Sequence, residues 1–360
     1  MSRPARLQLS LAIEPLPLKA PFRIAGYSFE AMPALTAILS DKHCYGRGEA
    51  SGVYYLDDTP SSMLATLESC RETIEAGIDR KRLRTLLPPG GARNAIDCAL
   101  WELQAQRENR PVWELAGLSG TWPLLTAFTL GADAPDTVAA GARAYTHARL
   151  LKLKLDGAVD TDIARIAAAR SARLDVRLAV DANQAYTLAS IEPLIAALVE
   201  HDVSLLEQPF ARGREADMDD LDCPIDVAAD ESLQGLDDVD ALHGRFDVLN
   251  IKLDKCGGLT EALLIVARAR ELGMKLMVGN MLGTSWAAAP GYVLGHLCDV
   301  VDLDGPTFLA GDRARSVTYR DGCIHCPGDV WGGAIADAAP AHAAVDAASP
   351  FDDLHTGSRP

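Results

Sequence analysis

The chain has 360 residues, of which 34 are Lys or Arg and 50 are Asp or Glu, so its formal net charge is −16. Hydrophobic residues make up 48% and charged residues 23%, a composition typical of globular proteins with a sizeable core. A surface that binds nucleic acid or an anionic membrane needs clustered Lys and Arg, and the sequence has no such cluster. The composition therefore excludes nucleic-acid and membrane roles and leaves a homo-oligomer open.

The N-terminus does not have the pattern of a targeting segment, because Glu14 and Pro15 interrupt the short apolar run that begins at Leu7. No stretch approaches the roughly 18 apolar residues that a membrane helix needs. Eight cysteines in a chain of this length are too few for a disulfide scaffold. We therefore expect a reduced, cytoplasmic protein.

The N-terminal part of the chain predicts a small α+β unit. Residues 7–14 alternate apolar and polar side chains as a half-buried strand does, and 34–40 and 44–50 predict two further strands. Helical segments are expected at 61–76 and 91–106, and in the second of these the apolar residues recur at helical spacing. Strands followed by helices favour one compact α+β layer.

After about residue 123, short apolar runs that end in a polar residue alternate with Ala-rich helical segments. The runs predict eight strands, at 125–130, 150–155, 177–181, 203–207, 225–230, 247–252, 275–280 and 299–304. The polar residues that mark successive strand ends are 22 to 28 residues apart, which is the length of one βα unit. Eight such units close a TIM-like barrel.

The active site of such a barrel lies at the C-terminal ends of its strands, where Asp181, Glu207 and Asp230 end three successive strands. Three converging carboxylates repel one another unless a cation lies between them. Oxygen ligands without His or Cys suit a hard ion such as Mg²⁺. In the alternative interpretation each carboxylate caps the following helix, which for Asp230 alone is the simpler view. The ordered set favours a metal site.

Three lysines flank these carboxylates. Lys152 and Lys154 lie two apart on one strand, so both side chains point into the barrel mouth, and Lys252 ends the strand beyond the three carboxylate strands. Two ammonium groups beside a divalent cation lower each other's pKa, which makes a neutral amine available as a base. A substrate held at the metal would have one lysine on each face, as a two-base racemisation or epimerisation requires.

In its order of motifs the chain resembles the muconate-lactonizing subgroup of the enolase superfamily. The motifs are KxK at 152–154, DxN at 181–183, EQP at 207–209, DES at 230–232 and KxDxxGG at 252–258. Residues 45–50 also resemble the GxGEA strand of that family's capping domain, and residues 93–101 resemble the helix that leads into its barrel. The resemblance covers about residues 7–330.

The resemblance implies a modified TIM (β/α)-barrel over residues 121–319. It also implies an α+β capping domain over residues 1–120, completed by C-terminal residues from about 320 to 360. Mg²⁺ is then expected on the three strand-end carboxylates, with Lys154 and Lys252 as the acid–base pair.

The last predicted strand resembles the DxD motif of dipeptide epimerases, with Asp302 and Asp304. Two carboxylates on one face of a strand suit a cation, and in that family they hold the free α-ammonium of a dipeptide. The resemblance thus predicts Mg²⁺-dependent epimerisation of a dipeptide, L-Ala-D/L-Glu or a related one, at the α-carbon of its C-terminal residue. The alternative for either aspartate is that it caps a loop.

Other activities of the subgroup stay open at this point. They are N-acylamino acid racemase, o-succinylbenzoate synthase and muconate-type cycloisomerase, all of which share the lysines and the metal. An alternative of another class is a barrel that binds Mg²⁺ and a ligand without turnover.

The resemblance also suggests substrate contacts beyond the catalytic groups, at Thr129, Lys152, Tyr27, Met281 and Ser285. The sequence defines less clearly which side chain the site accepts on the second residue of the dipeptide. The family's Ala-Glu epimerases hold the Glu side chain with a basic residue in the loop after the first strand. In this chain that loop, residues 21–29, has Arg23 directly after Phe22 and aromatic residues farther on. Trp286 stands where a second basic residue would be expected, so an apolar or broad second residue is open.

Overall fold

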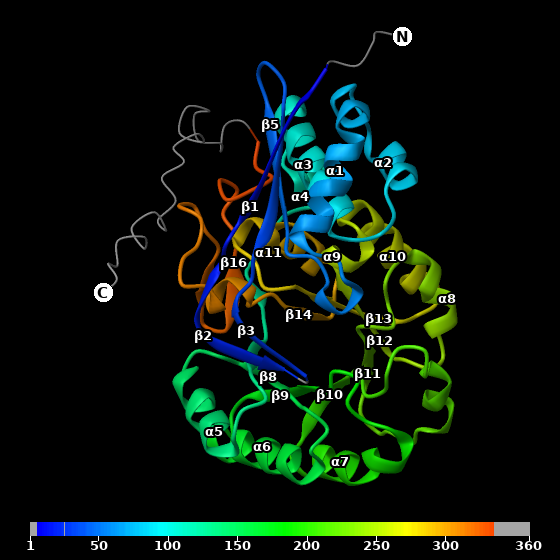
Figure 1. Ribbon diagram of the computed structural model, residues 1–360. Coiled ribbons are helices and arrows are strands. Elements are labelled where there is room, and N and C mark those ends of the chain that lie inside the picture. The colour runs from blue at the N-terminus through cyan, green and yellow to red at the C-terminus, as the bar shows by residue number, and fades with distance from the viewer. Residues whose placement is uncertain (1–5, 25, 335–360) are drawn as a thin grey trace, which may run out of the picture.

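An N-terminal α+β capping domain lies against one end of an eight-stranded parallel barrel in the computed structural model (Figure 1). The structure describes residues 6–24 and 26–334. The last part of the predicted C-terminal completion of the capping domain, residues 335–360, lies outside the described residues. No helix of the described residues is long and apolar enough to cross a membrane.

The capping domain contains the predicted strands and helices with small shifts at their ends. Its antiparallel sheet has the order β1-β4-β5, with β1 Gln8–Glu14, β4 Ala34–Ser40 and β5 Tyr45–Ala50. Helices α1 Pro60–Glu75, α2 Arg80–Leu86 and α3 Gly91–Glu108 pack on one face of the sheet. Helix α1 begins at a capping box in which Thr59 and Ser62 exchange hydrogen bonds.

Strand β5 crosses helix α3 at close range because of two glycines. A Cβ at Gly46 would lie 1.9 Å from the backbone oxygen of Ala99, and a Cβ at Gly48 would lie 1.9 Å from that of Ala95. Any side chain at either position would push the strand off the helix. The GxG part of the motif at 45–50 is therefore explained by packing.

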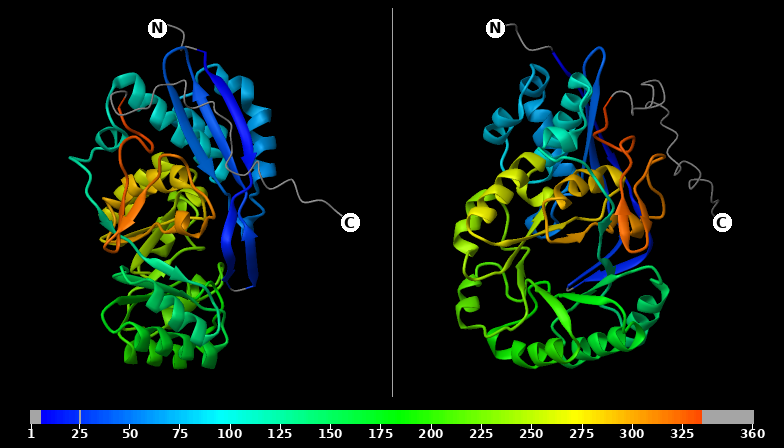
Figure 2. Two further views of the ribbon diagram at one scale, coloured as in Figure 1. Left: turned by 90° about the vertical axis from the view of Figure 1, so that its left-hand side faces the viewer. Right: turned by 180° about the vertical axis from the view of Figure 1, so that it is seen from behind.

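A two-stranded hairpin replaces the loop that the sequence predicted after the first strand. Strands β2 Pro17–Ile24 and β3 Tyr27–Ala31 pair with each other and extend from the capping sheet over the barrel (Figures 1 and 2). The barrel side holds the hairpin by backbone hydrogen bonds from Ala310 N to Pro17 O (2.8 Å) and from Ala132 N to Arg23 O (3.1 Å). The alternation of an ordinary strand is absent because the hairpin has no continuous buried face.

The predicted barrel is confirmed, with its strands in sequence order from β7 to β14. They are β7 Phe128–Leu130, β8 Leu150–Lys154, β9 Arg177–Asp181, β10 Val203–Glu207, β11 Val227–Ala229, β12 Val248–Lys252, β13 Lys275–Gly279 and β14 Val300–Asp302. The main helices between them are α5 Pro135–Ala144, α6 Val159–Ala172, α7 Leu188–Glu200, α10 Leu259–Glu271 and α11 Ser285–Gly295. A separate apolar cluster fills the barrel with residues from successive strands.

The run predicted as one strand at 125–130 divides between two sheets. Residues Leu124–Leu125 form β6, which pairs with β16 Cys323–His325, and β16 in turn pairs with β15 Thr318–Arg320. The chain then enters the barrel at β7. A hydrogen bond from Ala127 N to Val301 O (2.9 Å) links the two ends of the barrel sheet, so the barrel is nearly closed.

Two recognised motifs, at 93–101 and 252–258, hold the capping domain on the barrel. Gly52 N donates to Asp254 Oδ1 (2.9 Å), and Thr260 N donates to Asp97 Oδ2 (2.9 Å). Gly258 has φ +109° and lies so close to α3 that a Cβ there would be 2.6 Å from the Asp97 side chain. Apart from Lys252, these motifs therefore specify an interface between the domains.

Residues near the end of the described chain return to the capping domain. Trp331 Nε1 donates to Arg47 O (2.8 Å), and Gly332 N donates to Glu102 Oε1 (3.1 Å). Val112 N donates in turn to Gly332 O (2.7 Å). The two sides of this contact are more than 200 residues apart in the sequence.

Candidate active site

Five adjacent strands present charged residues at the C-terminal rim of the barrel, in the order base, acid, acid, acid, base. These residues are Lys154 at the end of β8, Asp181 at the end of β9, Glu207 at the end of β10, Asp230 directly after β11 and Lys252 at the end of β12. The parallel register brings the ends of neighbouring strands to one level, as the pairing of Lys154 with Asp181 shows.

The three acidic side chains form a compact buried cluster. One carboxylate oxygen from each of Asp181, Glu207 and Asp230 lies within 4.8 Å of the other two. Each residue is 1% exposed or less, so water does not screen their mutual repulsion. An all-oxygen set of this kind fits a hard divalent cation. The three residues could hold a metal ion.

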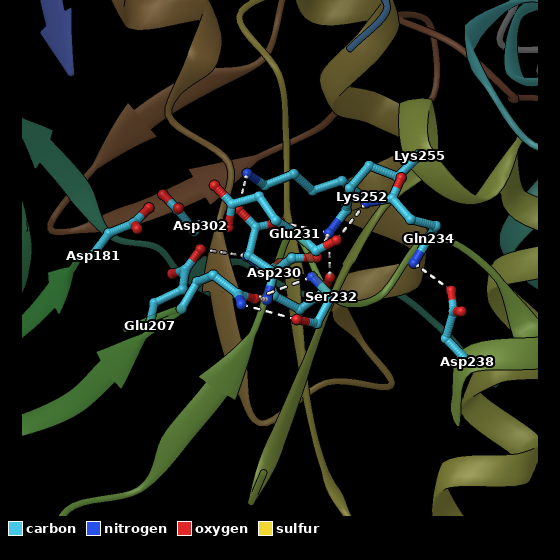
Figure 3. Close-up of polar contacts among 12 residues, drawn as sticks. Asp181, Glu207, Asp230, Glu231, Ser232, Gln234, Asp238, Lys252, Lys255 and Asp302 are labelled. Carbon is cyan, nitrogen blue, oxygen red and sulfur yellow. Dashed lines mark hydrogen bonds and ion pairs between the residues drawn. The ribbon is translucent and has the colours of Figure 1, made fainter. Parts of the chain in front are cut away.

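The two predicted acid–base lysines contact the outer members of the cluster. Lys154 Nζ lies 2.6 Å from Asp181 Oδ2, and Lys252 Nζ lies 2.7 Å from Asp230 Oδ2. Figure 3 shows that Lys252 and Lys255 both reach toward Asp230. Because β8 and β12 lie on opposite sides of the three acidic strands, the two lysines approach the cluster from opposite sides.

The protein's own charged groups raise the pKa values of two lysines of the site, Lys152 and Lys252. Burial lowers the pKa of Lys152, but the nearby Asp302 and Glu207 carboxylates outweigh it and hold that pKa well above its usual value. Burial also lowers the pKa of Lys252, but the Asp230 and Glu207 carboxylates outweigh burial and raise that pKa well above its usual value. The predicted lowering of a lysine pKa depends on a divalent cation, whose positive charge would oppose the effect of these carboxylates.

Neighbouring side chains that the sequence analysis did not single out fix the acidic cluster. Asn250 Nδ2 donates to Glu207 Oε1 (2.9 Å), and Lys255 Nζ donates to Asp230 Oδ1 (2.5 Å). Gln208 Oε1 accepts a hydrogen bond from the Asp230 backbone N–H (2.9 Å). Asn250 could have been found, because it lies two residues before Lys252 on one strand and shares its face. Lys255 lies in the short helix α9 (Leu253–Cys256), where strand spacing gives no signal.

The predicted DxD pair lies across the barrel mouth from these groups. Asp302 Oδ2 accepts from Lys152 Nζ (2.8 Å), whereas its Oδ1 is buried without a hydrogen-bond partner among the described residues. Asp304 Oδ2 accepts from Thr129 N (2.6 Å). Burial and the neighbouring Asp302 raise the pKa of Asp304 to about 7. Two buried carboxylates with spare acceptor capacity suit a cationic group.

A cavity of about 640 Å³, its open mouth included, joins these groups. Barrel residues Thr129, Lys152, Lys154, Asp230, Lys252, Met281, Asp302 and Asp304 line one side of it. The capping domain covers the other side with Phe22, Ile24, Phe29, Met32, Tyr54 and Tyr55. Converging polar groups on one side and an apolar cover on the other suit a small-molecule ligand.

Comparison with known proteins assigns the family. Residues 16–117 match the N-terminal domain of the mandelate racemase and muconate lactonizing enzymes, and residues 136–351 match the enolase C-terminal domain-like family. The chain belongs to the enolase superfamily. Its relatives in this superfamily include racemases and epimerases, and this chain is an enzyme of that kind.

Two curated relatives cover most of the chain. The L-Ala-D/L-Glu epimerase of Escherichia coli K12 is 36% identical over 314 residues, which is 87% of this chain and 97% of the relative. The N-acetyl-D-glutamate racemase of a Pseudoalteromonas species is 35% identical over 303 residues, 83% of this chain and 95% of the relative.

Two solved structures of the superfamily have the same fold. An enolase family member from Agrobacterium tumefaciens, with bound sodium and L-Ala-L-Glu, has a TM-score of 0.86 at 34% identity, covering 89% of this chain and 98% of that one. A dipeptide epimerase from Methylococcus capsulatus, complexed with Mg and L-Arg-D-Lys, has a TM-score of 0.84 at 30% identity, covering 89% and 97%.

Two residues expected to contact substrate in this superfamily lie outside the set that lines the cavity. Tyr27 is 45% exposed on the hairpin and packs its ring on Tyr54, with centroids 4.5 Å apart. Ser285 is fully buried at the start of α11, where its Oγ donates to Asp312 Oδ2 (2.6 Å) and accepts from Val317 N. Thr129 and Met281 do line the cavity.

Proposed function

We propose that this enzyme epimerises dipeptides at the α-carbon of the C-terminal residue. The observation that carries the proposal is the placement of one lysine on each side of the acidic cluster, with the Asp302/Asp304 pair on a third side. L-Ala-D/L-Glu or a related dipeptide offers one group for each of these features. Its carboxylate would face the acidic cluster, its α-hydrogen the lysines, and its ammonium the Asp302/Asp304 pair.

The two lysines account for inversion. One of the two lysines must first lose a proton to act as the base, and it then takes the α-hydrogen as a proton from one face of the α-carbon. The other lysine donates a proton to the opposite face. Because Lys154 and Lys252 approach the cluster from opposite sides, either can serve as base for one stereoisomer. A single base could not return the proton to the opposite face.

The acidic cluster accounts for acidification of the α-hydrogen. Asp181, Glu207 and Asp230 would hold Mg²⁺, which supplies positive charge to the substrate carboxylate as negative charge develops there. Asn250 and Lys255 keep two of these carboxylates in place by the contacts described above. Lys152, fully buried against Glu207 and Asp302, connects the cluster with the ammonium side of the cavity.

A variant of the DxD pair can distinguish a dipeptide substrate from an N-acylated amino acid, since only the dipeptide has a free ammonium. Asp304→Asn keeps an acceptor for Thr129 N and removes the negative charge. We expect kcat/KM for an L,L-dipeptide to fall by a factor of tens to thousands, because roughly 2–5 kcal/mol is lost with a buried charge-assisted contact. The N-acetylated analogue should be affected much less.

The measurement is kcat/KM for the dipeptide and its N-acetylated analogue in both proteins. If the wild type prefers the acetylated compound, or if the variant lowers both rates alike, the dipeptide assignment is wrong. N-acylamino acid racemisation would then replace it, and the Pseudoalteromonas relative is named as a racemase of one such compound, N-acetyl-D-glutamate.

A further inference from the structure

Opposite the acidic cluster, the cavity is lined by a group of aromatic and apolar side chains, which we call the aromatic wall. The capping domain contributes Phe22, Ile24 and Phe29 of the hairpin and Tyr54 of the short helix η1 (Tyr54–Leu56). The barrel side contributes Phe308 of η4 (Gly305–Phe308), which follows β14. The rings of Phe22 and Phe308 are 4.8 Å apart, and those of Phe29 and Tyr54 are 5.3 Å apart. These edge-on and tilted contacts hold the wall in one arrangement.

The proposed function leaves one substrate group to meet the aromatic wall. The α-carbon has four substituents, of which the carboxylate would face the acidic cluster and the peptide nitrogen would lead to Asp302 and Asp304. The α-hydrogen must face Lys154 or Lys252. The remaining substituent is the side chain of the C-terminal residue, and the remaining side of the cavity is the aromatic wall.

Within residues 6–24 and 26–334, the charges around the cavity do not offer a partner for an acidic side chain. The three lysines that line it already contact carboxylates. On the hairpin, Arg23 Nη1 lies 3.0 Å from Asp133 Oδ1 with its side chain 54% exposed, and Lys19 Nζ donates to Thr307 O. Neither Arg23 nor Lys19 is among the residues that line the cavity. Glu231, which is 2% exposed, adds a further acidic side chain to the lining.

We propose that the aromatic wall selects dipeptides whose C-terminal residue has an uncharged, apolar or aromatic side chain. The proposal rests on the proposed function and adds the class of side chain to it. An apolar side chain gains by leaving water for the aromatic wall, whereas a carboxylate loses its hydration without gaining a cation. The named substrate of the E. coli relative, L-Ala-D/L-Glu, would therefore be a poor substrate for this chain.

The test compares side chains of similar length and different polarity. L-Ala-L-Met, L-Ala-L-Gln, L-Ala-L-Glu and L-Ala-L-Lys are incubated with the Mg²⁺-loaded full-length enzyme in D₂O, and kcat/KM is measured from deuterium incorporation at the C-terminal α-carbon. We expect L-Ala-L-Met to exceed L-Ala-L-Glu by at least about tenfold, the scale of discrimination that an apolar pocket provides. L-Ala-L-Gln should fall between them.

A matched pair of variants tests whether the aromatic wall is the cause. Phe29→Arg introduces a cation on the cavity side of β3, whereas Ser28→Arg introduces the same cation at the preceding, exposed position. Successive residues of a strand point to opposite faces, so the second variant is the control. Phe29→Arg should raise the Glu/Met ratio of kcat/KM by about tenfold, and Ser28→Arg should leave it as in the wild type.

The outcomes separate the two proposals. If the wild type turns over dipeptides but prefers L-Ala-L-Glu or L-Ala-L-Lys to L-Ala-L-Met, the selection proposal is overturned and the proposed function stands. The same holds if Phe29→Arg, still active, leaves the Glu/Met ratio unchanged. If no dipeptide incorporates deuterium, the proposed function fails and the selection proposal fails with it.

Discussion

At the residue scale, the site is a buried cluster in which lysines pair with the carboxylates from both sides. Asp181 has Lys154 and Lys152 beside it, and Asp230 has Lys252 and Lys255. Removing one member would leave a partner buried and unpaired, which is costly in a low-dielectric interior. The same contacts fix the position of each ammonium group. The atoms that balance the buried charges are therefore also the atoms that position the proposed catalytic groups.

The acid–base pair gives the first prediction. Lys154→Ala and Lys252→Ala should each lower the rate of epimerisation by at least about 10²-fold, because each variant lacks the proton donor or acceptor for one face. Each should still exchange the α-hydrogen of a single stereoisomer with D₂O, and the two variants should act on opposite isomers. Chiral chromatography gives the first quantity and mass spectrometry the second. Near-normal epimerisation by either variant would contradict the two-base assignment.

A pH dependence follows from the raised pKa of Asp304, which is about 7. A carboxylate with that pKa takes up a proton as the pH falls through 7, and the neutral acid no longer balances a substrate ammonium. We therefore expect kcat/KM for dipeptides to decrease below pH 7 in the wild type. The N-acetylated analogue should lack the part of the decrease that comes from Asp304, and so should Asp304→Asn with the dipeptide. An identical acidic limb in all three profiles would show that another group causes it.

At the element scale, the close crossing of β5 and α3 determines where the capping domain stands over the barrel. The strand that carries Gly46 and Gly48 continues directly into Glu49, whose carboxylate accepts from Thr284 N (2.6 Å) and pairs with Arg313 (2.7 Å). Both partners belong to segments that follow barrel strands. A shift of β5 on its helix would therefore displace the contact between the domains as well.

Gly48→Ala should destabilise the protein by about 3 kcal/mol, at the upper end of the usual cost of overpacking, because the atom in the way is a backbone oxygen of α3. The shift of the urea unfolding midpoint measures this cost. Gly120→Ala is the matched control, since nothing lies within 4 Å of a Cβ at that position, and it should change stability by less than about 0.5 kcal/mol. Equal midpoints for the two variants would refute the packing argument.

At the scale of the whole molecule, the metal site couples ligand binding to stability. The three carboxylates come from strands that are distant in the sequence, so a bound cation stabilises only the folded chain. Mg²⁺ should raise the melting temperature steadily with the logarithm of its concentration above Kd, corresponding to about 2.7 kcal/mol at a concentration of 100 Kd. EDTA should abolish activity, and Mg²⁺ should restore it.

Variants separate this effect from general ion binding to an acidic protein. Asp181→Ala and Glu207→Ala should lose both the thermal shift and the restored activity, whereas Asp304→Asn, outside the cluster, should keep the thermal shift. Scanning fluorimetry with and without Mg²⁺ provides the measurement. Full activity of a metal-free preparation would rule out the metal site.

The sequence predicted the barrel and its rim because one βα unit repeats and each strand ends on a polar residue, as at Asp181 and Glu207. It did not predict the hairpin, since Pro17 and Pro21 and the lack of a buried face hide the strand period. The pKa values of Lys152 and Lys252 could not be predicted from the sequence either. They depend on distances such as that from Lys152 Nζ to Glu207 Oε2, which no spacing along the chain gives.

The division of the cavity between two parts of the chain has a consequence for how such an enzyme can diversify. In the proposed reaction, proton transfer depends on side chains carried by β8 and β12, whereas most of the aromatic wall lies on the hairpin and the turn that holds Tyr54. The hairpin joins the barrel partly through backbone hydrogen bonds, which tolerate a change of side chain, and partly through the side chains of Lys19, Phe22 and Arg23. Exchange of residues 17–31 between relatives would therefore alter which substrates are accepted and leave the proton-transfer groups untouched. New specificities can arise by mutation in this short segment while the catalytic residues stay under unchanged selection.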